Sequence, residues 1–275
     1  MKKAAVIGFP IIHSWSPKIH NFWLNEYHIR GSYDKVELKP DDLAKFILDL
    51  KKNHYCGLNI TIPHKESASK LCDKLTKNAK ILGAVNLLTV KNGLLEGRNT
   101  DGEGFVESLK ESFPNIKLSN SSIAIIGAGG AAKSIAYALD KFSPKKIIFF
   151  NRNIKRAENF IKSAGIRASA LELKDINNHQ NGFTILINAT SVGMLGTKGD
   201  LKIDFKKYRG LDVFADIVYN PYKTKNIIAA KKLGIKTLGG MGMLLYQAVP
   251  AFEAFYGKKP IVTESLKNYM KKFMR

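Results

Sequence analysis

The chain has 275 residues, and its 44 lysines and arginines against 23 aspartates and glutamates give a formal net charge of +21. Hydrophobic residues make up 45% and charged residues 24%, an ordinary globular composition that excludes a wholly disordered chain. No apolar stretch approaches the roughly 18 residues that a membrane span needs, so we expect no membrane partner.

The beginning of the chain is predicted to form a β-strand. Its short apolar run is interrupted by Pro10, His13 and Ser14, and no small-residue cleavage site follows, unlike in a signal peptide. The two cysteines, Cys56 and Cys72, form neither a disulfide framework nor a metal-ligand spacing. These observations predict a protein of the cytoplasm.

The positive charge raises the question of nucleic-acid binding. Lysines are spread along the chain, and the densest segment, 258–275, holds six basic residues against Glu264 alone. The sequence has no RNA-binding aromatic signature, zinc finger or basic zipper. We therefore expect no nucleic-acid partner, and we interpret the charge as a solvated surface that attracts anionic small molecules.

The first hundred residues alternate between strand-like and helix-like segments. Apolar periodicity predicts strands over 4–9, 33–38 and 57–62, and helices over 17–29, 40–50 and 65–82. Segments 84–90 and 94–98 flank an Asn-Gly pair, which predicts a β-hairpin.

From residue 121 the strands become continuously apolar. They are predicted over 123–126, 146–150, 183–188 and 211–218, with helices to about residue 139 and over 153–163. Strands of this type alternating with helices indicate a parallel sheet covered on both faces.

The fold class is therefore α/β, with two domains, as the length also suggests at about 150 residues per domain. We expect an N-terminal α/β substrate domain over 1–101 and a Rossmann-like, doubly wound nucleotide domain over 102–239. C-terminal helices over 240–275 are expected to return to the first domain.

A glycine-rich turn follows the first buried strand of the second domain and precedes a helix. Its first glycine permits the tight turn, and its second lets the backbone approach a pyrophosphate, which the helix N-terminal amides bind. Ala132 stands in the third glycine position. The predicted cofactor-binding residues of this turn are Gly127, Ala128, Gly129, Gly130 and Ala131.

The end of the next strand distinguishes NAD from NADP. NAD sites usually place a carboxylate there for the ribose 2′-hydroxyl, whereas this sequence has Asn151, Arg152, Lys155 and Arg156 with no acid before Glu158. Arginine donates bidentate, charge-assisted hydrogen bonds to a 2′-phosphate. We predict that NADP is the cofactor and that Asn151, Arg152 and Arg156 bind it.

Polar clusters lie at the ends of elements in the first domain. After the first strand come Ser14 and Ser16; Ser16 can be interpreted as a helix cap, with Pro17 at the first helical position, but Ser14 has no role in that scheme. Asn59 and Thr61 share one face of the third strand.

Two charged residues complete the predicted chemistry. Lys65 falls in a first helical turn, where the helix dipole disfavours a cation and so suits proton transfer. Asp101 either caps the helix that follows it or pairs with Lys65.

These motifs, taken together and in this order, resemble the shikimate/quinate dehydrogenase family over nearly the whole chain. The matching segments are 13–17, 59–65, 83–86, 99–102, 127–132, 151–152, 188–194, 216–221 and 240–248.

The resemblance implies reversible reduction of 3-dehydroshikimate to shikimate by hydride transfer from NADPH, in chorismate and aromatic amino-acid biosynthesis. It implies that Lys65 is the proton-transfer residue and Asp101 its partner. The implied substrate-binding residues are Ser14, Ser16, Asn59, Thr61, Asn86, Asp101, Tyr219 and Gln247. For the cofactor it adds Ile217, where relatives often have methionine, and Gly240.

Several alternatives stay open from sequence. A quinate/shikimate dehydrogenase that uses NAD is one, although the Ser14–Ser16 pair and the arginines favour shikimate and NADP. A non-catalytic ligand sensor should lack the Lys65–Asp101 pair. The histidines His13, His20, His28, His54, His64 and His179 show no metal-ligand spacing, so no metal is expected. A monomer and a homodimer are both compatible with the sequence.

Overall fold

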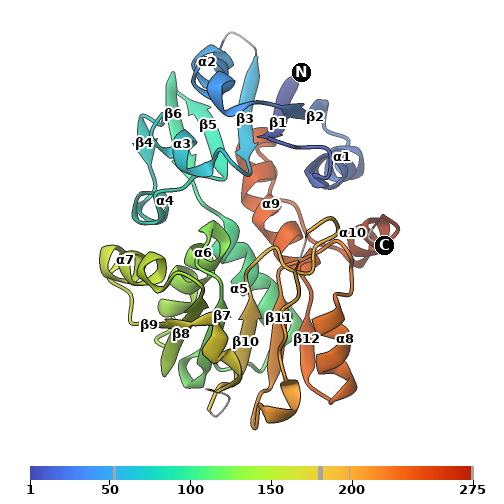
Figure 1. Ribbon diagram of the computed structural model, residues 1–275. Helices are drawn as coiled ribbons and strands as arrows, with labels where there is room; N and C mark the ends of the chain where they lie inside the picture. Colours follow the sequence, from blue (N-terminus) through green and yellow to red (C-terminus); the bar gives the residue numbers. More distant parts are fainter. Residues whose placement is uncertain (52–53, 179–181, 198, 274–275) are drawn as a thin grey trace. The chain divides into compact units, whose positions relative to one another are not determined.

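The computed structural model describes residues 1–51, 54–178, 182–197 and 199–273 and is shown in Figure 1. The chain divides into two compact units. The first unit comprises Met1–Thr100 and Leu245–Met270, and the second unit comprises Asp101–Leu244 together with the residues from Lys271 onward.

The first unit contains a mixed six-stranded sheet in the order β2-β1-β3-β5-β6-β4. Strand β1 pairs in parallel with β2 and β3, whereas β5 pairs antiparallel with β3 and β6. The strands are β1 Lys2–Gly8, β2 Gly31–Glu37, β3 Tyr55–Ile60, β4 Lys74–Leu75, β5 Leu87–Lys91 and β6 Leu94–Arg98.

The predicted hairpin is confirmed as β5 and β6. Asn92 and Gly93 both have positive φ, at 50° and 76°, which is the two-residue turn that matches the twist of antiparallel strands.

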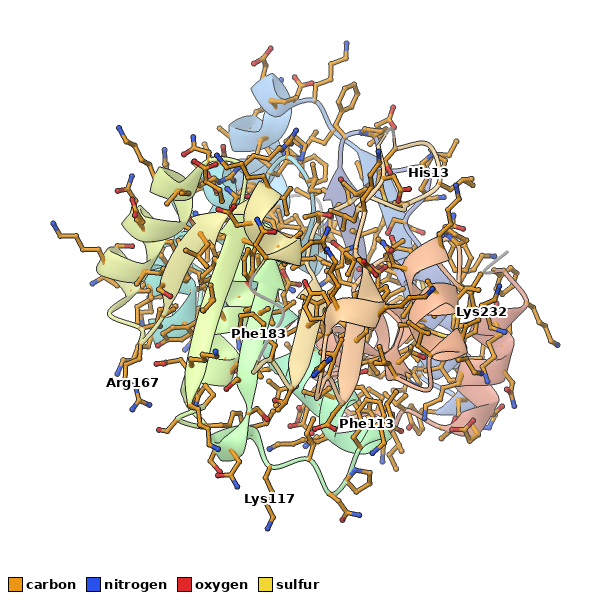
Figure 2. All side chains as sticks on the ribbon, turned by 60° about the horizontal axis from the view of Figure 1, so that its bottom comes forward. His13, Phe113, Lys117, Arg167, Phe183 and Lys232 are labelled. Atoms are coloured by element: carbon orange, nitrogen blue, oxygen red, sulfur yellow. The ribbon has the colours of Figure 1, made fainter. Side chains whose placement is uncertain are left out.

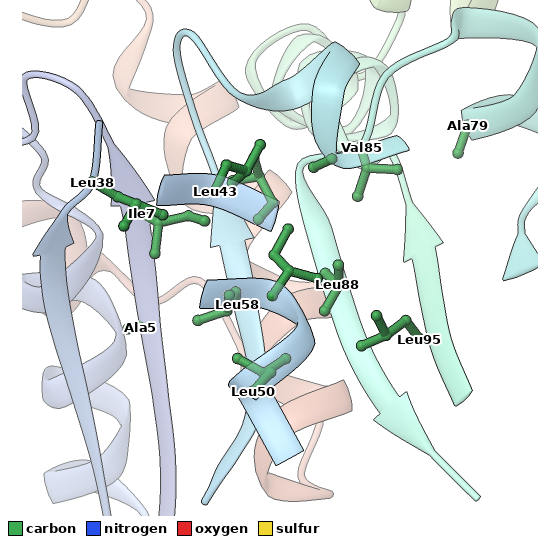
Figure 3. Close-up of a cluster of buried hydrophobic side chains, with 13 residues drawn as sticks. Ala5, Ile7, Leu38, Leu43, Leu50, Leu58, Ala79, Val85, Leu88 and Leu95 are labelled. Atoms are coloured by element: carbon green, nitrogen blue, oxygen red, sulfur yellow. The ribbon is translucent and has the colours of Figure 1, made fainter. Parts of the chain in front are cut away.

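Helices cover this sheet and build its core. The helices with residues in the first unit are α1 Ser16–Glu26, α2 Leu43–Leu48, α3 Lys65–Ser69, α4 Lys77–Leu82, the part of α9 Met241–Tyr256 from Leu245, and most of α10 Glu264–Lys271. Figure 3 shows side chains of the sheet gathered with those of the α2 region in one buried cluster, including Ile7, Leu43, Leu50, Leu58 and Leu88. Because that burial removes apolar surface from water, it holds α2 against the strands.

Residues 65–82, which we expected to be mostly helical, form two short helices and not one. Helix α3 ends at Ser69, and Lys74 and Leu75 then pair in parallel with β6 before α4 begins at Lys77. Asp73 accepts a hydrogen bond from the Leu95 backbone at 2.7 Å, which ties this segment to the sheet. Pairing with a distant strand thus overrides the local helical pattern.

The second unit contains six parallel strands in the order β12-β11-β10-β7-β8-β9. This arrangement, with the first strand of the unit at the centre and the chain winding outward to both sides, is that of a Rossmann fold, so the predicted fold class is confirmed. The strands are β7 Ser122–Ile126, β8 Lys146–Asn151, β9 Ser169–Glu172, β10 Ile185–Asn188, β11 Val213–Asp216 and β12 Lys236–Leu238.

Four helices of the second unit accompany these strands, α5 Asp101–Ser112, α6 Gly130–Asp140, α7 Ile154–Ala164 and α8 Lys225–Lys232. Helix α7 packs beside β8 and β9, and α8 packs beside β11 and β12. The chain reverses its strand order between β7 and β10, which is where ligands bind in open parallel sheets.

Basic side chains of the second unit are scattered over its surface. In Figure 2, Lys117, Arg167 and Lys232 extend away from the ribbon at separate places. Within the described part of the chain, no helix is long and apolar enough to cross a membrane.

Candidate active site

Two serines lie between β1 and the beginning of α1. Trp15 occupies the N-cap position and its side chain makes no cap hydrogen bond, so the interpretation of Ser16 as the cap is wrong. Ser16 is instead the first helical residue, followed by Pro17, and its hydroxyl accepts a hydrogen bond from the Ser14 hydroxyl at 3.5 Å. Two hydroxyls therefore lie side by side and are not committed to capping.

The first unit brings three predicted substrate-binding residues together. The Asn59 side chain donates to the Asn86 carbonyl oxygen at 3.1 Å, and the Asn86 side chain donates to Gln247 Oε1 at 3.3 Å. Thr100 completes the cluster, because its backbone N–H donates to Asn86 Oδ1 at 2.9 Å and its hydroxyl donates to the Gln247 carbonyl oxygen at 2.9 Å. Polar side chains from β3, the start of β5 and α9 thus form one hydrogen-bonded cluster.

Lys65 begins α3, and its side chain is half-buried. Its carbonyl oxygen accepts a hydrogen bond from Val85 N at 3.0 Å, immediately before Asn86. Helix α3 has only five residues, so the helix-dipole argument for Lys65 carries less weight than the sequence suggested. Asp101 begins α5 in the second unit and directly follows Thr100 in the chain.

The glycine-rich turn connects β7 to α6 in the second unit. Gly127 has a φ of +102°, and a Cβ there would lie 2.8 Å from Thr190 Cγ2, so both conformation and crowding require glycine. In contrast, a Cβ at Gly129 or Gly130 would meet no atom of the described residues within 4 Å. Gly129 is the N-cap of α6 and has no side chain to cap the first amides of the helix.

The carboxyl end of β8 carries the predicted 2′-phosphate residues. Asn151 ends the strand and donates to the Asn153 carbonyl oxygen at 2.8 Å, and Asn153 caps α7 by accepting from Arg156 N at 3.3 Å. The Arg152 and Arg156 side chains are exposed, and the first turn of α7 contains no acid. This cationic corner suits the 2′-phosphate of NADP.

Ile217 and Gly240 lie against one another in the second unit. A Cβ at Gly240 would lie 2.0 Å from the Ile217 carbonyl oxygen, and Gly240 N donates to the Val218 carbonyl oxygen at 3.2 Å. Position 240 is therefore a glycine because its backbone lies too close to the Ile217–Val218 backbone for a side chain. Tyr219 follows two residues after Ile217 and is half-buried, and burial raises its pKa.

Sequence reasoning missed a buried network that fixes this segment. Asp216 accepts hydrogen bonds from the Asn188 side chain at 2.9 Å, from Val218 N at 3.1 Å and from the Thr224 hydroxyl at 2.7 Å. Asn188 and Asp216 end the adjacent parallel strands β10 and β11, and that pairing of two polar strand ends is the signal that identifies them. The network anchors the loop that carries Ile217.

The Asp216 network predicts a specific pH dependence of stability. Burial raises the pKa of Asp216 from its ordinary value to about 6, although its three hydrogen bonds lower it. Below a pH of about 6, the Asp216 carboxyl group therefore keeps its proton in the folded protein, whereas in the unfolded chain it has already lost this proton above its ordinary pKa. As the pH rises from 4 to above 6, the contribution of Asp216 to the free energy of unfolding therefore falls by about 3 kcal/mol.

Asp216→Asn removes this contribution, so the difference in unfolding free energy between wild type and variant should itself change by about 3 kcal/mol over that range. Denaturant unfolding of both proteins at pH 4, 5, 6 and 7 measures it. A difference that is constant with pH would contradict the assignment.

The described residues hold no group of three or more His, Cys, Asp or Glu side chains able to bind a metal ion. His179, one of the histidines considered above, lies outside the described residues.

The Rossmann order, the open glycine turn and the basic corner beyond β8 are typical of a dinucleotide-binding unit, and the first unit adds a hydrogen-bonded cluster of polar side chains. A protein with these features belongs to the class of nucleotide-dependent dehydrogenases built from two units. The family description "Shikimate dehydrogenase substrate binding domain" matches residues 6–88, and "Shikimate / quinate 5-dehydrogenase" matches residues 107–221. The chain belongs to the shikimate/quinate dehydrogenase family.

Individual relatives agree with this assignment. The chain is 40% identical to "Shikimate dehydrogenase (NADP(+))" of Brucella abortus (strain S19), covering 98% of this chain and 93% of the relative. A crystal structure of a shikimate dehydrogenase in complex with NADP+ matches with a TM-score of 0.90 at 32% identity, covering 100% and 96% of the two chains. Shikimate 5-dehydrogenase from Thermus thermophilus, in complex with NADP(H) and shikimate, matches with a TM-score of 0.87 at 29% identity, covering 99% of both chains.

Proposed function

We propose that this protein catalyses the reversible, NADPH-dependent reduction of 3-dehydroshikimate to shikimate, a step of chorismate and aromatic amino-acid biosynthesis. The observation that carries the proposal is the hydrogen-bonded cluster of Asn59, Asn86 and Gln247 in a chain of this family. Amide side chains that converge in this way suit a ligand with several hydroxyl groups.

NADP is held by the second unit. The amides at the start of α6 bind its pyrophosphate beside Gly129 and Gly130, and Arg152 and Arg156 bind the 2′-phosphate. The remaining predicted contacts are Gly127, Ala128, Ala131, Asn151, Ile217 and Gly240. When bound, NADP supplies the hydride donor and acceptor of the reaction.

Most of the proposed substrate-binding residues belong to the first unit, and Asp101 and Tyr219 belong to the second. The paired hydroxyls of Ser14 and Ser16 donate to its carboxylate. Its ring hydroxyls are bound by Asn59, Thr61, Asn86, Asp101, Tyr219 and Gln247. In this division of labour, most substrate-binding residues lie within residues 1–101 and the C-terminal helices from 240, and most cofactor-binding residues lie within residues 102–239.

Lys65 moves the proton. In the reducing direction, protonated Lys65 donates to the carbonyl oxygen of 3-dehydroshikimate as negative charge develops on it. In the oxidising direction, neutral Lys65 accepts the proton of the hydroxyl group. Asp101 orients the Lys65 ammonium group and accepts a hydrogen bond from a neighbouring substrate hydroxyl.

Product analysis tests the proposed reaction. The protein is incubated with 3-dehydroshikimate and NADPH deuterated at the transferable position, and the product is examined by NMR. We expect shikimate that carries one deuterium at the reduced carbon. Product without deuterium at this carbon, or unchanged 3-dehydroshikimate, would contradict the proposal.

We place the enzyme in the cytoplasm, where its thiols, Cys56 and Cys72, stay reduced and unpaired. Its partners are small molecules, and it acts as a monomer or a homodimer. Light scattering coupled to size-exclusion chromatography distinguishes these two states from larger assemblies, which would contradict this expectation.

A further inference from the structure

Tyr33 is a buried residue of β2 that sequence analysis did not connect with the site. Its side chain is 1% exposed, and its hydroxyl donates to Asn59 Oδ1 at 2.6 Å. Tyr33 pairs with Ala4 of β1, and Asn59 pairs with Val6 of the same strand, so both side chains project from one face of the sheet. Because Ala4 is small, the phenol reaches across β1 toward β3.

Contacts with Tyr33 and Asn86 together hold the Asn59 amide in one orientation. Oδ1 accepts from the Tyr33 hydroxyl at 2.6 Å, and Nδ2 donates to the Asn86 carbonyl oxygen at 3.1 Å. A rotated amide would set Oδ1 against the Asn86 carbonyl oxygen, two acceptors in contact, so Asn86 fixes the orientation of the amide, and the Tyr33 hydroxyl holds Oδ1 in that orientation. The second N–H of Nδ2 is then the donor that a ligand of Asn59 meets.

The Tyr33 ring is itself held by aromatic contacts. His20 stacks on it with a centroid distance of 3.9 Å and an interplanar angle of 7°. His20 is fully buried, and neither of its ring nitrogens has a hydrogen-bond partner among the described residues; burial lowers its pKa to about 3, so its ring is neutral. Burial also raises the pKa of Tyr33 well above its ordinary value, although a hydrogen bond with the Ser16 side chain lowers it, so the phenol keeps the proton that it donates.

We propose that Tyr33, stacked on His20, is a positioning residue: its hydrogen bond to Oδ1 holds the Asn59 side-chain amide in place, with Nδ2 available as an N–H donor to a hydroxyl group of the substrate. The inference rests on the proposed function, since shikimate supplies that hydroxyl group. The inference also predicts a substrate specificity. The ligand atom that faces Asn59 must accept a hydrogen bond, so a ligand with an N–H donor group at this ring position should bind more weakly.

The test compares shikimate dissociation constants, measured by isothermal titration calorimetry, for four full-length proteins. They are the wild type, Tyr33→Phe, Asn59→Ala and the double variant. Tyr256→Phe is the matched control, because the Tyr256 hydroxyl donates to the Ser32 carbonyl oxygen at 2.8 Å in the same aromatic cluster rather than to Asn59. Thermal unfolding of each protein verifies folding.

We expect Tyr33→Phe to weaken shikimate binding by roughly 5- to 10-fold, the effect of a lost hydrogen bond, with NADP binding unchanged. In the Asn59→Ala background the same substitution should have a clearly smaller effect, because Tyr33 acts mainly through Asn59; the remainder is the part carried by its hydrogen bond with Ser16. Tyr256→Phe should lower thermal stability similarly and leave shikimate binding unchanged.

Equal weakening by Tyr33→Phe and Tyr256→Phe, or a full Tyr33→Phe effect in the Asn59→Ala background, would overturn the positioning role and leave the proposed reaction standing. A wild type that binds shikimate without oxidising it would overturn the reaction, and the Tyr33→Phe effect on binding would still support or overturn the inference. A wild type that does not bind shikimate overturns both.

Discussion

Lys65→Ala should lower kcat for shikimate oxidation by about 10²- to 10⁴-fold, the usual contribution of a positioned acid–base group. Shikimate binding should change by only about threefold or less, because proton transfer is needed in the transition state and not in the bound ground state. Steady-state kinetics with NADP, together with a calorimetric dissociation constant for shikimate, separates the two effects.

Two further variants sharpen this test. Lys70→Ala removes an exposed lysine at the other end of α3 and should leave kcat unchanged. Lys65→Arg keeps the positive charge but removes a group that can lose its proton, so it should be nearly as inactive as Lys65→Ala. If Lys65→Ala loses affinity and rate equally, Lys65 is a binding residue and the proposed proton transfer is wrong.

Arg152→Ala should weaken NADP binding by about 10- to 100-fold, the effect of losing charge-assisted hydrogen bonds to a phosphate. NAD lacks the 2′-phosphate, so its binding should change little. Dissociation constants of both nucleotides, measured for wild type and variant at one salt concentration, give the change in preference directly.

Arg167→Ala is the matched control for the loss of charge. Arg167 is an exposed arginine of the same unit that lies 3.8 Å from Asp140, and Figure 2 shows it extending into solvent. This variant should reduce the binding of both nucleotides only slightly, and somewhat more for the more highly charged NADP, through the weaker surface field alone. If Arg152→Ala keeps the wild-type preference for NADP over NAD, the proposal that the basic residues beyond β8 select NADP is wrong.

Much of the fold can be predicted from local pattern. The continuously apolar strands and the alternation with helices predicted the parallel sheet of the second unit, and the glycine turn was placed correctly between β7 and α6. Asn92-Gly93 likewise predicted the hairpin, since both residues accept positive φ. These features depend on interactions between residues that are near in sequence.

Features that depend on distant partners were missed. The segment at Lys74 leaves its helical pattern to pair with β6, and nothing local signals that partner. From the sequence alone, Tyr33 is an ordinary strand residue. Only the order of the strands in the sheet shows that its hydroxyl lies beside Asn59. Asp216 matched a family motif, but its role as an anchor becomes visible only when β10 and β11 lie side by side.

The most direct test of the proposed function is the near-ultraviolet absorbance of the purified protein mixed with shikimate and NADP. The same measurement is repeated with NAD in place of NADP and with quinate in place of shikimate. We predict rapid formation of NADPH from shikimate and NADP, and much slower reduction of either nucleotide in the other mixtures. A folded protein that produces no reduced nucleotide in any mixture would contradict the account and favour a ligand sensor.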